Sequence, residues 1–188
     1  MSWTPATVVA LLFFFSELLL GIVRRSRGGE ATSRDRGSLI IFWIVNTVAI
    51  FGALFCAKSG FARLPLSHNA REITAISLMV VGLAFRWYSI ITLGRFFTVN
   101  VAAHADHQLV DFGPYRLIRH PSYTGLLIAF VGLAIYFGTW VGLIVMLVPI
   151  TLALLYRIHV EEAALGEVLG AQYEAYRART KRLIPGVL

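Results

Sequence analysis

Four long apolar tracts dominate this chain, and they constrain its fold more than any other feature. A helix needs roughly 20 mostly apolar residues to span a bilayer, and Thr4–Val23, Ser38–Ala57 and Ile73–Leu93 each have that length. The fourth tract, Thr124–Tyr156, is too long for one comfortable span and slightly short for two. A turn near Phe137-Gly138-Thr139 would make it a tight helical hairpin. We therefore predict an all-α, polytopic membrane helical bundle of about five transmembrane helices.

Composition supports this interpretation. Charged residues make up 14% of the chain and the mean hydropathy is +0.73, whereas a soluble domain has about 25% charged residues. No repeat or linker divides the chain, so we expect one membrane domain over residues 1–188. Residues 1–93 would form three N-terminal spans, and residues 94–188 a long loop, the hairpin and a polar tail. The lone Cys56 cannot form an intrachain disulfide or a thiolate metal site, and we predict no metal.

The distribution of Arg and Lys predicts the orientation in the membrane. The first loop, the third loop and the tail carry most of these residues, and positive residues favour the cytoplasmic side. With an odd number of spans, the N-terminus lies outside and the third loop and C-terminal helix form a cytosolic cap. A four-span alternative, with Thr124–Tyr156 as one long helix, would separate the loop from the tail. The chain carries a net charge of +7, and we expect membrane lipids and a lipophilic small molecule as its partners and no nucleic acid.

Two charged residues lie inside the predicted spans. Glu17 and Arg86 are each a few residues from the cytosolic end of their span, which places both roughly 10 Å below that surface. A buried charge in a bilayer is tolerated when it is paired, so we predict a Glu17–Arg86 ion pair. The alternative is that these side chains line a cavity.

The stretch Gly113–Tyr123 concentrates polar chemistry beside an apolar tract. Pro121 suits the first turn of a helix, and His120, as the residue before proline, is pushed out of the α region. The free N–H groups at such a helix start attract an anion. Tyr115 and Tyr123 add ring faces and hydroxyls. The alternative is a basic, aromatic interfacial belt that only anchors the helix.

A second polar cluster follows the last apolar tract directly. Arg157 and Glu161 are four residues apart and share a helix face, with Glu162 beside them. An ordinary surface salt bridge is the alternative interpretation. Downstream, a stripe at helical spacing would pack the tail along the cap and carry the glutamates over the third loop; it consists of Leu165, Leu169, Tyr173 and Tyr176.

Together these residues resemble a known family. The string Arg119-His120-Pro121-Ser122-Tyr123-x-Gly125, then a hydrophobic hairpin, Arg157, Glu161-Glu162 and Gly170-x-x-Tyr173-x-x-Tyr176 is similar to the isoprenylcysteine carboxyl methyltransferase family. Phospholipid methyltransferases are close relatives of that family. The resemblance covers Gly94 to Pro185, about half of the chain. The short chain is similar to prokaryotic members, which implies a prokaryotic inner membrane.

The resemblance implies a methyl transfer from S-adenosyl-L-methionine, with S-adenosyl-L-homocysteine as product and without a Rossmann domain. Arg157 would hold the carboxylate of a lipophilic, isoprenylcysteine-like substrate, and Arg119 would be a second positive group. His159 departs from the acidic run of eukaryotic members. By similarity, the cofactor-binding residues would be His107, Gln108, Leu109, Val110, Tyr115, His120, Pro121, Ser122, Tyr123, Glu161 and Glu162.

The chemistry of the acceptor predicts what the site needs. A carboxylate with a pKa near ~4 is already ionised at neutral pH, so we predict no catalytic base. Two alternatives stay open at this point: a lipid amine N-methyltransferase with the same cofactor site, and a non-enzymatic lipid-binding membrane protein. The sequence does not determine the oligomeric state.

Overall fold

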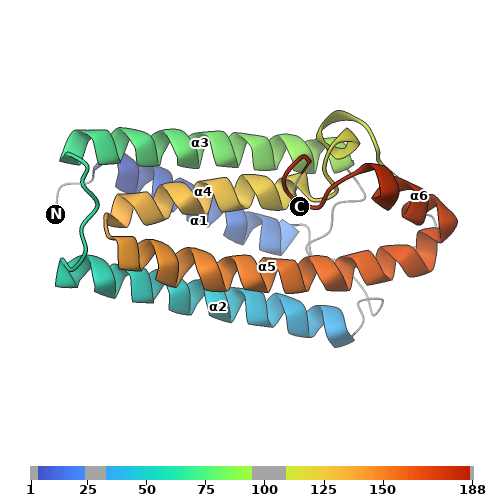
Figure 1. Ribbon diagram of the computed structural model, residues 1–188, viewed down its shortest axis with the longest axis horizontal. Helices are drawn as coiled ribbons and strands as arrows, with labels where there is room; N and C mark the ends of the chain where they lie inside the picture. The colour runs from blue at the N-terminus through green and yellow to red at the C-terminus, as the bar shows by residue number, and fades with distance from the viewer. Residues whose placement is uncertain (1–3, 24–32, 95–108, 187–188) are drawn as a thin grey trace.

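The computed structural model describes residues 4–23, 33–94 and 109–186, and every regular element in these ranges is helical (Figure 1). The predicted all-α class is therefore confirmed. The helices are α1 (Pro5–Val23), α2 (Ser33–Ser59), α3 (His68–Leu93), the short 3-10 helix η2 (Gly113–Arg116), α4 (Pro121–Phe137), α5 (Trp140–Leu169) and α6 (Ala171–Arg179).

Within the described residues, α1, α2, α3 and α5 are long and apolar enough to cross a membrane, and α4 is a shorter apolar helix of 17 residues. The predicted hairpin is confirmed. Gly138 ends α4 in the left-handed conformation at φ 78°, which glycine adopts without strain. Thr139 then caps α5 by accepting a hydrogen bond from the Gly142 N–H at 3.1 Å. The four-span alternative, in which this tract is a single helix, is wrong.

Two helices begin earlier than their apolar tracts predicted, at Ser33 for α2 and at His68 for α3. The reason for α3 is visible in its cap, because the Ser67 side chain accepts a hydrogen bond from the Ala70 N–H at 3.2 Å. α5 likewise continues beyond Tyr156 to Leu169 in one piece. Hydropathy marks the part of a helix that lies in lipid, whereas capping chemistry decides where the helix ends.

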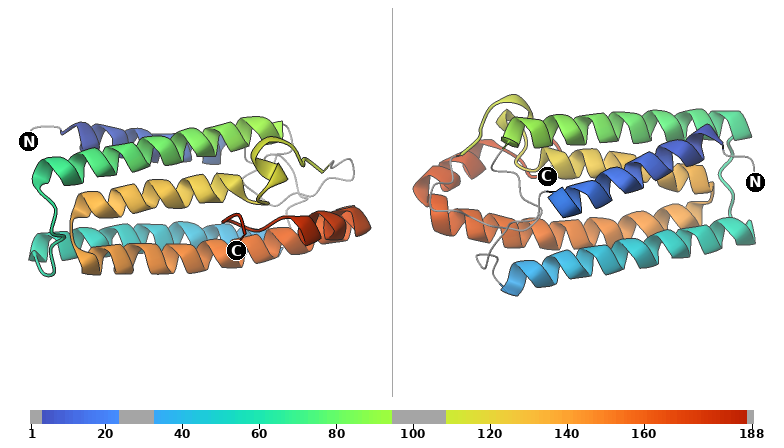
Figure 2. Two further views of the ribbon diagram at one scale, coloured as in Figure 1. Left: turned by 45° about the horizontal axis from the view of Figure 1, so that its top comes forward. Right: turned by 180° about the vertical axis from the view of Figure 1, so that it is seen from behind.

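The bundle is held together most closely where α3 crosses α4. A Cβ atom on Gly82 would lie 2.5 Å from the Ala129 nitrogen, and one on Gly125 would lie 2.6 Å from the Arg86 nitrogen. Glycine at both positions therefore lets the two backbones touch. Figure 2 shows α4 running beside α3 while α5 runs beside α2. The arrangement places the start of α4 next to the C-terminal part of α5.

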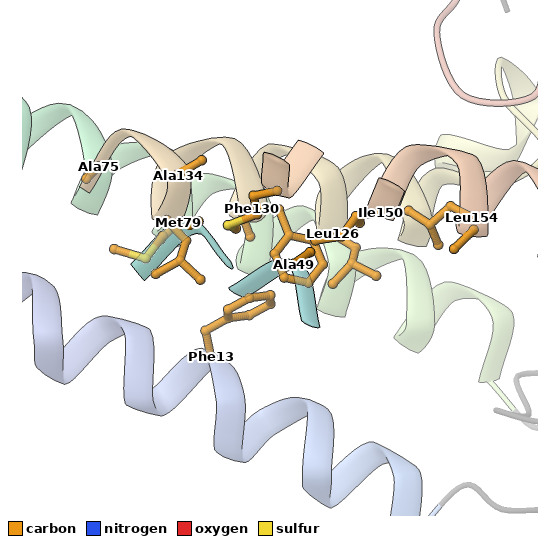
Figure 3. Packing of buried hydrophobic residues seen from close by; sticks show 14 of the residues in the cluster. Phe13, Ala49, Ala75, Met79, Leu126, Phe130, Ala134, Ile150 and Leu154 are labelled. Carbon is orange, nitrogen blue, oxygen red and sulfur yellow. The ribbon is translucent and has the colours of Figure 1, made fainter. Parts of the chain in front are cut away.

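The core joins the first three helices to the hairpin. Phe13 of α1 meets Phe130 of α4 edge to face, with ring centroids 5.3 Å apart (Figure 3). Met79, Met146 and Ile150 are fully buried in the same cluster. Large apolar side chains such as Phe51 and Ile91 point outward instead, as expected of helices whose outer surface faces lipid.

The two ends of the bundle differ. At one end, the α2–α3 connection hydrogen-bonds to the hairpin turn, through Leu64 N–H to the Gly138 carbonyl at 2.9 Å and Trp140 N–H to the Ala62 carbonyl at 2.8 Å. At the other end, η2, the start of α4, the end of α5 and α6 come together (Figure 1). Both polar clusters singled out in the sequence lie at this second end.

Candidate functional site

The first polar cluster surrounds the start of α4. His120 is the N-cap residue with φ −124° and ψ 57°, and Pro121 opens the helix, as predicted. We expected free N–H groups at this helix start, but the N–H groups of Arg119 and His120 are both hydrogen-bonded. The Arg119 N–H donates to the Lys181 carbonyl at 2.7 Å, and the His120 N–H donates to the Arg182 carbonyl at 3.0 Å. The carbonyl groups of the C-terminal segment, rather than an anion, therefore accept these two hydrogen bonds.

A buried ion pair also contacts the start of α4. Arg86 donates to both Glu17 carboxylate oxygens, at 2.6 and 2.7 Å, which confirms the predicted pair. A further Arg86 N–H donates to the Ser122 carbonyl at 3.1 Å. Ser122 is itself buried, as is Pro121 beside it. The pair therefore links α1 and α3 to the first turn of α4.

The hairpin brings the second cluster against the first. Because α5 is continuous through Leu169, it carries Glu161 and Glu162 back alongside His120. The His120 Nδ1 atom lies 3.4 Å from Glu161, and its Nε2 atom lies 3.5 Å from Glu162. Burial by itself would lower the pKa of His120, but the two carboxylates close to the ring outweigh it and raise the pKa above 6.5. An imidazolium between two carboxylates results.

Arg157 lies at the centre of the cluster and is only 3% exposed. Its Nε donates to the Tyr123 hydroxyl at 2.9 Å, and its Nη1 donates to the Ser38 hydroxyl of α2 at 3.2 Å. The Tyr123 hydroxyl in turn donates to Glu161. Glu161 also lies 3.5 Å from the Arg157 guanidinium. The alternative of an ordinary surface salt bridge is therefore wrong, because Arg157 and Glu161 belong to a buried network that joins three helices.

The two neighbouring glutamates have different surroundings. Glu162 is buried, and it accepts from Arg119 at 2.7 Å and from Arg182 at 3.0 and 2.9 Å. Arg119 also donates to the Thr180 carbonyl at 2.5 Å. Among the residues that the structure describes, Glu161 has its short contact to Tyr123 and longer contacts to His120 and Arg157. Arg119 and Glu162 are thus tied to the C-terminal segment, while Glu161 keeps capacity for a further partner.

Tyr115 lies at the edge of this cluster, buried in η2. Its hydroxyl donates to the Ser89 carbonyl at 3.3 Å, and its own carbonyl accepts from the Tyr176 hydroxyl at 2.7 Å. Burial raises the pKa of the Tyr115 phenol, so this residue stays a neutral donor. Leu109 and Val110 precede η2 and are half-buried. His107 and Gln108 lie outside the described residues.

The cluster retains buried hydrogen-bonding atoms that fit a polar ligand. Among the described residues, the His120 Nε2 atom and the Tyr173 hydroxyl are buried and make no hydrogen bond. Leaving such a group unsatisfied costs about 1–3 kcal/mol, so each is a natural contact for a bound molecule. With the carboxylate of Glu161 they offer donors and an acceptor within one polar cluster. This set suits a zwitterionic ligand such as the amino acid portion of S-adenosyl-L-methionine.

Sequence reasoning missed two residues of the network, Ser38 and Arg182. Ser38 was assigned only as the start of an apolar tract, but it is buried against Arg157. Arg182 was counted only as a tail charge, but it binds Glu162. A serine on the first turn of an apolar tract is the only local signal for the first. Nothing in the sequence spacing signals the second, because the chain reverses direction after α6.

The part of the chain that holds these clusters is similar to a known protein family. Residues 75–167 match the model of the isoprenylcysteine carboxyl methyltransferase (ICMT) family. This range begins in the first third of α3, ends in the last turn of α5 and contains both polar clusters. The match and the contact network therefore point to the same part of the chain.

Individual relatives agree with the family match. Over 112 residues the chain is 36% identical to protein-S-isoprenylcysteine O-methyltransferase A of Arabidopsis thaliana, covering 58% of this chain and 57% of that protein. It is 33% identical to enzyme B of the same plant over 60% of this chain and 58% of the relative. The Schizosaccharomyces pombe protein-S-isoprenylcysteine O-methyltransferase is 26% identical over 77% of this chain and 66% of its own. The chain thus spans little more than half the length of the two plant relatives.

Proposed function

Because the chain belongs to the isoprenylcysteine carboxyl methyltransferase family, we propose that it methyl-esterifies the carboxylate of a lipophilic, isoprenylcysteine-like acceptor. The methyl donor would be S-adenosyl-L-methionine, with S-adenosyl-L-homocysteine as product. The observation that carries this proposal is the buried contact network of His120, Tyr123, Arg157 and Glu161 at one end of an apolar helical bundle.

The donor would be held on the α4 side of the network. When bound, it supplies a methyl group on a positively charged sulfonium. Glu161 is suited to the donor's amino group or ribose hydroxyls, because a carboxylate makes strong hydrogen bonds with cationic donors and with hydroxyls. The unpartnered His120 Nε2 and Tyr173 hydroxyl add polar contacts. Tyr115, Pro121, Ser122 and Tyr123 line this part of the chain, and His107, Gln108, Leu109, Val110 and Glu162 complete the proposed donor-binding set.

Arg157 would orient the acceptor. Its planar guanidinium is suited to binding both oxygens of a carboxylate, and its burial among helices supplies desolvation. The Tyr123 and Ser38 hydroxyls accept from its Nε and Nη1 atoms and hold the guanidinium plane in place. An acceptor carboxylate is ionised at neutral pH, so no side chain has to remove a proton. Arg119 is a second positive group in the proposed site, acting beside Glu162.

We also propose that the protein is a multi-pass protein of a prokaryotic inner membrane, with its N-terminus outside and its C-terminus cytoplasmic. The polar end of the bundle would then face the cytosol, where the donor is dissolved. A lipophilic acceptor would reach the same end from the bilayer. Cysteine scanning with a membrane-impermeant thiol reagent tests this orientation, after the native Cys56 has been replaced by alanine.

The proposal is tested with purified protein in detergent or lipid vesicles. Radiolabelled S-adenosyl-L-methionine is offered with N-acetyl-S-farnesylcysteine and, separately, with a total lipid extract. We expect the label in the farnesylcysteine product, and we expect mild base to release it as methanol because the product is a methyl ester. A base-stable product in the lipid extract would indicate amine methylation instead. If calorimetry shows no affinity for S-adenosyl-L-homocysteine and Tyr123→Ala changes nothing, the protein is not a methyltransferase.

A further inference from the structure

The C-terminal segment after α6 returns to the site and lies along the approach to α4. Lys181 pairs with Ile118 in a parallel bridge, and its N–H donates to the Leu117 carbonyl at 3.3 Å. The Thr124 hydroxyl donates to the Leu183 carbonyl at 2.7 Å. Leu183 is 2% exposed, so its side chain anchors the segment in the bundle. We name residues 180–183 the C-terminal strap.

The strap reaches the acidic pair through one side chain. Arg182 places its Nε 3.0 Å and its Nη2 2.9 Å from Oε2 of Glu162. The other oxygen of the same carboxylate, Oε1, accepts from Arg119 at 2.7 Å. Each oxygen therefore has its own arginine, and the plane of the Glu162 carboxylate is fixed from two sides. Charge-assisted contacts of this kind are the strongest side-chain hydrogen bonds.

The fixed carboxylate has a consequence for His120. The Glu162 Oε1 atom lies 3.5 Å from the imidazole Nε2, the atom that makes no hydrogen bond among the described residues. The orientation of Glu162 therefore determines the electrostatic field at the imidazole edge that is available to a ligand. If Arg182 were removed, Oε2 would lose both of its contacts, and the carboxylate could rotate away from its present plane.

We propose that Arg182 is a positioning residue for the donor site. It acts through Glu162, which it holds so that the edge of His120 is set for S-adenosyl-L-methionine. This inference rests on the proposed function and adds a residue outside the range 75–167 that matches the family model. It also assigns Arg182 a role in donor affinity and none in binding the acceptor, because its guanidinium binds Glu162.

Arg182→Gln tests the proposal, because glutamine removes the charge and keeps a polar side chain. Lys181→Gln is the matched control, since it removes the same charge from the neighbouring, exposed side chain of the strap. We expect Arg182→Gln to raise the Kd for S-adenosyl-L-homocysteine and the KM for the donor about tenfold, the equivalent of one charge-assisted hydrogen bond. The acceptor KM should stay within about twofold, Lys181→Gln should match the wild type, and Arg182→Lys should recover most of the affinity.

Three outcomes would overturn the proposal. Unchanged donor affinity in Arg182→Gln is the first. An equal rise in donor KM and acceptor KM is the second, because it would mark a general loss of structure. The third is a loss of stability. If Arg182→Gln has a lower Tm or fails to purify as a folded protein, and Arg182→Lys does not, the instability would account for the lost affinity. If wild-type protein binds no S-adenosyl-L-homocysteine, the proposed function fails, and this result is distinct from all three.

Discussion

Two buried ionic groups lie within the bundle, and they differ in how completely their charges are matched. Glu17 and Arg86 face each other with two short contacts, at 2.6 and 2.7 Å, and a further Arg86 N–H donates to a backbone carbonyl. The network around His120 joins side chains of α2, α4, α5 and the strap and still has buried polar atoms without a partner. A closed pair is typical of structure, and an open network is typical of a binding site.

The difference follows from where each group sits in the bundle. Glu17 and Arg86 lie where helices pack side by side, so the charge of each is neutralised by the other. The His120 network lies where α4 begins and α5 continues past it, so several side chains converge without filling one another's hydrogen-bonding capacity. The predictions below separate the two groups by asking whether a substitution changes stability or ligand affinity.

Arg157→Ala should have the largest effect. It removes the one buried guanidinium that the proposal assigns to the acceptor, and loss of orientation at a reacting group costs about 100-fold or more in rate. We expect kcat/KM for N-acetyl-S-farnesylcysteine to fall by at least about 100-fold, measured by radiolabelled methyl transfer. Affinity for S-adenosyl-L-homocysteine should change far less, since the proposal places Arg157 on the acceptor side, where it touches the donor side through Glu161 and Tyr123.

Arg116→Ala is the control for that experiment, because Arg116 is an exposed arginine of η2. Arg157→Lys keeps the charge but loses the planar fork, so its rate should fall between those of the wild type and the alanine variant. A variant at position 157 that keeps acceptor turnover but loses donor affinity would reverse the assignment of the two sides.

Glu17→Ala should have the next largest effect, on stability. It leaves the Arg86 guanidinium buried without its carboxylate partner, and breaking a buried ion pair costs about 3 kcal/mol or more. The double variant Glu17→Met with Arg86→Met should recover much of that loss, since it leaves no unpaired charge. Unfolding by SDS titration measures both. A double variant that is stable but binds no donor would show that this pair belongs to the site.

Contacts that depend only on how two neighbouring helices lie in the membrane were predictable from the sequence. The hairpin turn at Gly138 and the Glu17–Arg86 pair both followed from tract length and depth in the membrane, because helical geometry is regular. The strap was not predictable. Its contacts use the backbone carbonyls of Lys181 and Arg182, which every residue type has, so no side-chain pattern marks them.

The position of the strap, which the sequence does not predict, also explains why the contacts of Arg119 differ from those expected. Its place before His120 suggested a charge facing the substrate, but its side chain binds Glu162 and the Thr180 carbonyl. Sequence spacing shows which residues share a helix face. It does not show which of several nearby cations a given carboxylate binds, since that depends on where the chain turns after α6.

Glu161→Gln should have a smaller effect, on donor affinity. It removes the carboxylate that keeps capacity for a ligand, while amide and carboxylate have similar shapes. We expect the Kd for S-adenosyl-L-homocysteine to rise about 30-fold, since a hydrogen bond to a charged group contributes about 2 kcal/mol. Calorimetry in detergent measures it, with the exposed Glu167→Gln on the same helix as control. Equal affinity in the wild type and Glu161→Gln would reject the assignment of this residue.

The smallest effect should be the dependence of stability on pH. His120 faces Glu161 and Glu162, with Arg119 and Arg182 on the far side of Glu162 and the Tyr123 ring stacked 5.8 Å away. Since the carboxylates raise the pKa of His120 above its unfolded value of 6.5, the folded state holds this proton more tightly. The stabilisation is fully present below that value and is lost as pH rises through the folded pKa.

SDS unfolding from about pH 6 to about pH 9 should therefore show the free energy of unfolding falling across this interval. The fall should be absent in His120→Gln and present in His159→Gln, which changes an exposed histidine of the same hairpin. A fall of equal size in all three proteins would place the titrating group elsewhere. The Glu17→Met and Arg86→Met double variant should keep the wild-type pH dependence, because it leaves His120 and both of its carboxylate neighbours unchanged.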